Sequence, residues 1–150
     1  MSSNVENVFN GLAWHDAHCF DFAFFRDERG EVARLTIAFN RGSETYELTQ
    51  IDVLDVAFID LKVDLDGKRD CSDNIAGAIC RMSSEWFNHF KEERQKEGFE
   101  GYYHFRVALI PPGKAIDIVA KDCAVRAFSG PLSRQQMIAR KVRPRGESRP

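Results

Sequence analysis

Residues 18–40 read HCFDFAFFRDERGEVARLTIAFN and contain two runs in which apolar residues alternate with other residues. Phenylalanine stands at every second position over residues 20–24, which predicts an extended strand with three rings on one face. A cluster of turn-forming residues follows at 27–30, and apolar side chains then alternate again over residues 33–39. Two alternating runs joined by a short turn predict an antiparallel hairpin.

The residues that follow extend this hairpin. A second turn at residues 40–43 and renewed alternation from Tyr46 to Gln50 predict a third strand, so that the three strands form a β-meander. Apolar residues also alternate over residues 51–63, but the phase of the alternation changes within this segment. A bulge or bend near Leu54-Asp55 would reconcile the two phases.

Helical spacing follows the sheet-forming region. Apolar residues recur every three or four positions between Ile75 and Phe90, and an amphipathic helix is predicted from Ser84 to Glu97. Residues 74–82 are compatible with either a strand or a helix, because their apolar residues also alternate and a central glycine disfavours a helix interior.

Strand patterns return in the last part of the body. Alternation over residues 103–109, a forced turn at Pro111-Pro112-Gly113 and apolar runs up to residue 128 predict two or three further strands. We therefore expect an α+β fold with an antiparallel β-sheet: a meander, then one long amphipathic helix that covers one face, then the closing strands. A half-open barrel or sandwich with one helix is the alternative.

Length and composition predict one domain with a tail. A chain of 150 residues has the usual size of a single domain, which we assign to residues 1–130. Residues 131–150 are basic and contain three prolines, which predicts a disordered C-terminal tail. The sequence has no export signal, no apolar run of about 18 residues, and four cysteines without a CxxC pair. We expect a cytoplasmic protein with reduced thiols and no membrane span.

Charge is divided between the body and the tail. Residues 1–130 contain 22 acidic and 15 basic residues, whereas residues 131–150 contain six basic residues and one acidic residue. Within the body, residues 52–73 hold seven aspartates against three basic residues. An acidic surface attracts a basic protein partner, such as a toxin or a nuclease. Nucleic acid is not expected to bind the body, although the basic tail could contact it.

We expect such a partner to meet a carboxylate patch with one or two aromatic anchors at its centre. The candidate partner-binding residues are Asp55, Asp60, Asp64, Asp66, Asp70, Trp86 and Tyr102.

A second candidate site precedes the first predicted strand. His15, Asp16 and His18 could bind a transition metal, and His18 could hold Cys19 as a thiolate. Against this, adjacent residues of a strand point to opposite faces, and the spacing supplies no further ligand. The glycine-rich phosphate motifs, the GxSxG hydrolase motif and the HExxH zinc motif are absent from the sequence. We therefore predict no catalytic residue and no cofactor.

Four segments resemble a known group of proteins. WHDAHCFDFAFFRD at 14–27, TIAFN at 36–40, DNIAGAICRM at 73–82 and AIDIVAKDCAVRAF at 115–128 are similar to a loosely defined family of small, uncharacterised bacterial proteins. Some members of this family are thought to be immunity proteins of polymorphic toxin systems. The resemblance implies a role in toxin neutralisation, and it assigns no catalytic residue. The basic tail departs from the family pattern.

These observations lead to one main hypothesis and two alternatives. The main hypothesis is a non-enzymatic binding protein, an immunity-type protein that neutralises a bacterial toxin through its acidic surface. One alternative is a small enzyme or metal-binding protein centred on the His15-Asp16-His18-Cys19 segment. The other is a structural or adaptor protein that is tethered by its basic tail.

Overall fold

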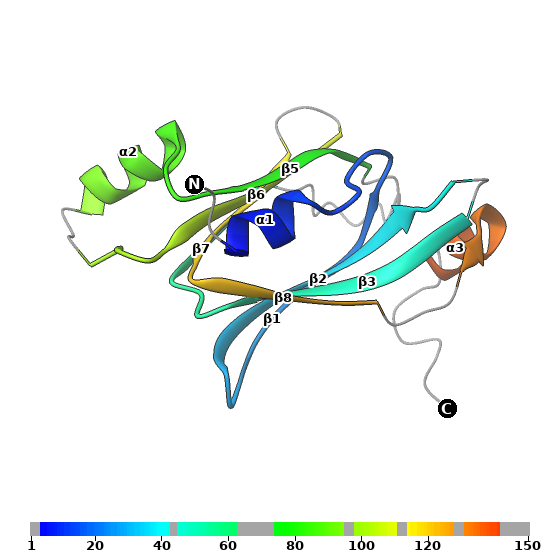
Figure 1. Ribbon diagram of the computed structural model, residues 1–150, viewed down its shortest axis with the longest axis horizontal. Coiled ribbons are helices and arrows are strands. Elements are labelled where there is room, and N and C mark those ends of the chain that lie inside the picture. The colour runs from blue at the N-terminus through cyan, green and yellow to red at the C-terminus, as the bar shows by residue number, and fades with distance from the viewer. Residues whose placement is uncertain are drawn as a thin grey trace.

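Two antiparallel β-sheets and three short helices make up the described part of the chain (Figure 1). The computed structural model describes residues 4–42, 45–62, 74–94, 98–110, 114–127 and 131–141. The first sheet has the strand order β1-β2-β3-β8, with β9 paired to the beginning of β3. Its strands are β1 (His18–Asp27), β2 (Gly30–Asn40), β3 (Thr45–Leu54), β8 (Asp122–Ala127) and β9 (Leu132–Ser133). The second sheet has the order β4-β7-β6-β5, with β4 (Phe58–Lys62), β7 (Ala115–Ala120), β6 (Tyr103–Leu109) and β5 (Ile75–Arg81).

The predicted meander is confirmed, with one correction to its side chains. Strands β1, β2 and β3 pair as consecutive antiparallel neighbours. The register of β1 against β2 shifts between Cys19 and Asp21, so Phe20 is the extra residue of a bulge. Phe22 packs against the main core, whereas Phe20 packs against a separate cluster around Tyr46. The prediction that all three rings share one face is therefore wrong, because the bulge reverses the alternation.

The expected irregularity at Leu54-Asp55 is confirmed, and it is a corner between the two sheets. Strand β3 ends at Leu54, and the chain continues as β4 in the other sheet. The chain also crosses between the two sheets from β7 to β8, because β7 pairs with β4 and β8 pairs with β3. Two backbone hydrogen bonds link the two passages, from the Lys121 N–H to the Leu54 carbonyl (3.1 Å) and from the Ala57 N–H to the Val119 carbonyl (2.8 Å). Two paired strands thus bend together from one sheet into the other.

Residue Asp55 supplies the bend on one of these strands. Its φ of 56° lies in the left-handed region, where asparagine and aspartate are tolerated better than other residues with a side chain. Three residues separate β3 from β4 while a single residue separates β7 from β8, so this strand carries the excess residues of the corner.

Residues 75–81, which the sequence left open between strand and helix, form strand β5. The N-terminal helix α1 (Asn4–Asn10) lies between the two sheets in Figure 1 and contacts both β5 and β8. The Asn10 side chain accepts a hydrogen bond from the Cys80 N–H (2.7 Å) and donates one to the Cys80 carbonyl (2.9 Å). It thereby satisfies two backbone groups of β5, as a neighbouring strand would.

A single main core joins the inner faces of both sheets. Leu35 and Ile51 of the first sheet are fully buried in the same cluster as Phe105 and Ile118 of the second. Phe9 of α1 completes this cluster, and its ring lies 5.2 Å from that of Phe105. The apolar alternation of the strands is therefore used on the faces that the two sheets turn toward each other.

The prediction of a single long helix after the meander is wrong. Helix α2 spans Glu85–Arg94, only ten residues, and the described chain contains two further short helices. Its start agrees with the prediction, because the Ser84 hydroxyl accepts a hydrogen bond from the Phe87 N–H (2.9 Å). Residues 95–97, the expected end of the helix, lie outside the described residues.

The predicted disordered tail begins with ordered structure. Helix α3 (Arg134–Lys141) starts at Ser133, whose hydroxyl accepts a hydrogen bond from the Gln136 N–H (3.1 Å). The Gln136 side chain in turn accepts a hydrogen bond from the Ser133 N–H (2.9 Å), which completes a capping box. Leu132 is buried in the cluster around Tyr46 and holds this segment against β3. Residues 142–150 lie outside the described residues.

The corner yields a test of stability. Asp55→Val places a β-branched residue at a left-handed φ, and we expect it to lower the free energy of unfolding by about 1–2 kcal/mol. Asp55→Gly should keep or raise stability, because glycine adopts this conformation without steric cost. Urea denaturation measures both variants, with Ala57→Val at a neighbouring exposed position as the control. Unchanged stability of Asp55→Val would contradict a conformational role for this residue.

Candidate functional site

The structure brings together only part of the predicted partner-binding set. Asp60 of β4 pairs in register with Asp117 of β7, and Trp86 of α2 stacks on His104, which hydrogen-bonds to Asp117. Asp60 and Trp86 therefore belong to the same outer face of the second sheet. Asp55 lies at the corner and is exposed. The other predicted aspartates, Asp64, Asp66 and Asp70, lie outside the described residues.

A buried carboxylate organises this outer face. Asp117 is fully buried, and its Oδ1 lies 2.6 Å from His104 Nε2. Arg106 donates to both oxygens of the same carboxylate, from Nε at 2.7 Å and from Nη2 at 3.1 Å. The register explains the meeting, because Arg106 stands directly opposite Asp117 on the neighbouring strand.

The hydrogen-bond chain continues into helix α2. His104 is 4% exposed, and its Nδ1 lies 2.8 Å from the Ser84 hydroxyl oxygen. Because this oxygen already accepts the Phe87 N–H, its own proton is free to be donated to His104 Nδ1. In this tautomer the Nε2–H group donates a hydrogen bond to Asp117 Oδ1. This chain of hydrogen bonds fixes the orientation of the His104 ring and joins α2 to the sheet.

Opposing effects act on the ionisation of Asp117. Burial favours the neutral acid, but the hydrogen bonds from His104 and Arg106 outweigh burial and lower the pKa of Asp117 below its usual value. The hydrogen bonds that Arg106 donates to Asp117 also raise the pKa of Arg106. An ion pair between a buried carboxylate and a partly exposed guanidinium thus lies beneath α2, and the hydrogen bond from His104 adds to it.

Ser84, His104 and Asp117 form the hydrogen-bonded series that serine hydrolases use. In such enzymes the serine oxygen must reach a substrate, and backbone N–H groups must face the developing oxyanion. Here the oxygen of Ser84 caps a helix, the ring of His104 is covered by Trp86, and Ser84 lines neither of the two hollows described below. These contacts favour a structural fastening of α2 over nucleophilic chemistry.

Trp86 is the aromatic residue that these contacts hold at the surface of the protein. Its indole ring stacks on the His104 ring at 4.4 Å and on the Phe90 ring at 5.5 Å, and it remains half-buried. Beside it lies an open hollow of about 590 Å³ between α2 and the sheet. The hollow is lined by Glu85, Trp86, Asn88, His89, Glu92 and Arg106.

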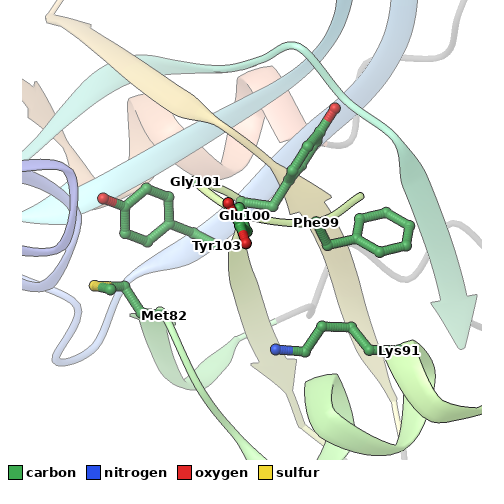
Figure 2. A pocket seen from close by; sticks show the side chains of 7 residues that line it. Met82, Lys91, Phe99, Glu100, Gly101 and Tyr103 are labelled. Carbon is green, nitrogen blue, oxygen red and sulfur yellow. The ribbon is translucent and has the colours of Figure 1, made fainter. Parts of the chain in front are cut away.

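Tyr102, the second predicted anchor, lies elsewhere. It lines a smaller pocket of about 340 Å³ together with Met82, Lys91, Phe99, Glu100, Gly101 and Tyr103 (Figure 2). Lys91 and Glu100 carry opposite charges there, so this pocket lacks the acidic character expected of the partner-binding patch. The Lys121 ammonium lies over the Tyr102 ring at 5.1 Å. Trp86 and Tyr102 therefore do not anchor one shared hollow.

The segment before β1 does not form the cluster that the enzyme or metal alternative requires. His15 and Asp16 lie 3.0 Å apart with side chains that are 93% and 65% exposed. His18 instead lies against the Tyr46 ring at 5.7 Å between ring centres. Among the described residues, no group of three or more His, Cys, Asp or Glu side chains is placed to hold a metal ion.

Three of the four cysteines lie in the described part of the chain. Cys19 and Cys123 are half-buried and Cys80 is buried. Burial raises the pKa of Cys80 and raises the pKa of Cys123 to about 11, which disfavours reactive thiolates at both positions. Cys71 lies outside the described residues.

The sequence did not identify the four residues at the centre of this face, which are Ser84, His104, Arg106 and Asp117. One signal was available, because Asp117 stands in the apolar run AIDIVA and a buried carboxylate requires a partner. Its partners lie 11 and 13 residues away, and no local spacing rule connects them.

Comparison with protein-family models, with curated proteins and with solved structures finds no match to the chain. No helix within the described ranges is long and apolar enough to cross a membrane.

The buried carboxylate predicts both a mutational and a pH effect. Asp117→Asn leaves Arg106 without its ion-pair partner, and we expect a loss of about 2–3 kcal/mol in the free energy of unfolding. Since the pKa of Asp117 is lowered in the folded protein, its contribution is present above pH of about 4 and is lost as pH falls through the folded pKa.

Denaturant titrations between pH 2.5 and 7 measure this contribution. Asp117→Asn should show a shallower decline at low pH than the wild type, with a remainder from Asp52, whose pKa Arg34 and Arg29 also lower. Glu28→Gln, at an exposed position, is the matched control and should follow the wild type. Equal pH slopes for the wild type and Asp117→Asn would contradict the assignment.

Proposed function

We propose that this protein is a non-enzymatic binding protein of the immunity type, which neutralises a basic protein toxin by covering the toxin's functional surface. The observation that carries the proposal is the hollow beside Trp86, where exposed carboxylates surround a half-buried aromatic ring. Interfaces of this kind gain most of their affinity from a few central aromatic residues, and charges around the rim steer the partner.

The immobilisation of Trp86 favours such a role. A side chain that is already ordered loses little conformational entropy when a partner binds. Stacking on His104 and Phe90 restrains the indole, and the hydrogen-bond chain from Asp117 to Ser84 restrains His104 itself. Burial of Asp117 thus supports a rigid anchor at the surface.

The charges around the hollow favour a basic partner. Glu85 and Glu92 line it, and Asp60 lies on the same face of the sheet. Arg106 also lines the hollow, but Asp117 already neutralises its charge. This distribution matches the net acidity of residues 1–130 and would accelerate association with a positively charged toxin, such as a nuclease, in the cytoplasm.

Co-expression with the product of the adjacent gene tests the proposal. We expect the wild-type protein to restore the growth of cells that express this product, and Glu85→Lys combined with Glu92→Lys to lose that protection. Both positions are exposed, so these changes should leave the fold intact. Glu93→Lys on the same helix is the control and should still protect, because Glu93 does not line the hollow. Arrested growth in the presence of the wild-type protein would refute the proposal.

Direct binding gives a second measurement of the same prediction. Trp86→Ala should weaken the complex by at least about thirtyfold, the effect expected for a central aromatic residue worth 2 kcal/mol or more. Circular dichroism of this variant must match the wild type. Affinity within threefold of the wild type would show that the anchor lies elsewhere.

A further inference from the structure

Helix α2 turns one polar stripe toward the hollow. Glu85, Asn88, His89 and Glu92 stand at positions i, i+3, i+4 and i+7, so they share one side of the helix. The stripe faces Arg106 on the sheet, and Trp86 lies between the helix and the sheet. One wall of the hollow is thus a helix face without a packing partner among the described residues.

The two carboxylates of this stripe differ from their neighbour on the same helix. Glu93 pairs with His89 at 3.0 Å. The carboxylates of Glu85 and Glu92 form no hydrogen bond or ion pair within the described part of the structure, although both line the hollow. They therefore retain their full capacity to accept hydrogen bonds from a ligand.

The floor of the hollow does not cancel their charge. The Arg106 side chain is 40% exposed, but two of its nitrogen atoms are bound to Asp117. Asp60 acts electrostatically on Arg106 as well. Arg94 is a second guanidinium on this face, where it lies over the Phe58 and Phe90 rings. The hollow and its surroundings thus combine four carboxylates, those of Glu85, Glu92, Asp60 and Asp117, with two guanidiniums, and this balance favours a cation.

The geometry points to a binding site for arginine side chains of a protein partner. Glu85 and Glu92 are seven residues apart, which corresponds to about 10 Å along a helix. Each carboxylate can accept a bidentate pair of hydrogen bonds from a separate guanidinium, and a guanidinium near Glu85 can also pack against the edge of Trp86. The expected occupant is a partner segment with two arginines whose side chains reach about 10 Å apart.

This inference rests on the proposed binding function and specifies its chemistry. Arginine fits better than lysine because its planar donors match a carboxylate bidentately, while an ammonium acts as a point charge. An acidic or purely apolar segment would leave Glu85 and Glu92 desolvated without a partner, which is costly.

The chain contains a built-in probe for the test. It has only two tryptophans, so an ¹⁵N-labelled sample gives two indole N–H resonances. The Trp14 indole is buried and donates to the Phe9 carbonyl at 2.9 Å, far from the hollow in sequence and packed in the main core. The Trp86 resonance reports on the hollow, and the Trp14 resonance serves as the internal reference.

The probe ligand is the blocked peptide acetyl-Arg-Gly-Arg-amide, titrated into the full-length protein. We expect the Trp86 resonance to shift and saturate while the Trp14 resonance stays in place. The same peptide with citrulline at both positions has nearly the same shape without charge and should produce no saturable shift. An equal response to both peptides, or none to the arginine peptide, would overturn the inference.

Matched variants locate the charges. Glu85→Gln and Glu92→Gln should each weaken the peptide by about threefold, the effect of losing one exposed ion pair, and the double variant by about tenfold. Glu93→Gln should bind within twofold of the wild type. If all three single variants weaken peptide binding equally, the peptide is attracted to the acidic surface in general, which would contradict a defined binding site.

The outcomes separate this inference from the proposed function. If the arginine peptide binds as expected but the adjacent gene product is not neutralised, the result supports the arginine-binding site and contradicts the immunity role. If the double variant Glu85→Gln, Glu92→Gln still neutralises the gene product, the result supports the immunity role and contradicts the arginine-binding site.

Discussion

Two paired strands that bend at one corner determine the arrangement of the other elements. The chain passes from β3 to β4 at the left-handed Asp55 and returns from β7 to β8 at Lys121, and backbone hydrogen bonds join the two passages. Because both strands turn together, their pairing continues on each side of the corner. The two sheets can then face each other and share one core, and the outer face of the second sheet remains available for α2.

That outer face contains a fully buried carboxylate, the side chain of Asp117. Asp117 is stable there because Arg106 and His104 supply three hydrogen bonds, and His104 passes the constraint on to Ser84 at the start of α2. The ion pair therefore does more than offset its own desolvation: it orients the His104 ring on which Trp86 stacks. The same interaction that secures the helix also shapes the hollow that we propose as the binding surface.

Sequence patterns predicted the strands well, because alternation with period two is a local property. The meander, the irregularity at Leu54-Asp55 and the closing strands follow from it. Single-residue irregularities limited its accuracy: the bulge next to Cys19 places Phe20 and Phe22 in different clusters. Helix α3 within the basic tail was not predicted from composition, although Ser133 and Gln136 have the spacing of a capping box.

Local sequence patterns indicate most of the extended segments, the turns between them, and the division of acidic and basic residues between body and tail, but they leave residues 74–82 open between strand and helix. Which polar side chains meet depends on the tertiary structure. Ser84, His104, Arg106 and Asp117 come from one helix cap and two strands, and their hydrogen bonds depend on strand register and on the coverage by α2. Likewise, Asp60 and Trp86 share a face because β4 crosses to the second sheet at the corner. Such contacts cannot be derived from local spacing, since the free energy that selects them comes from packing the sheets and the helix together.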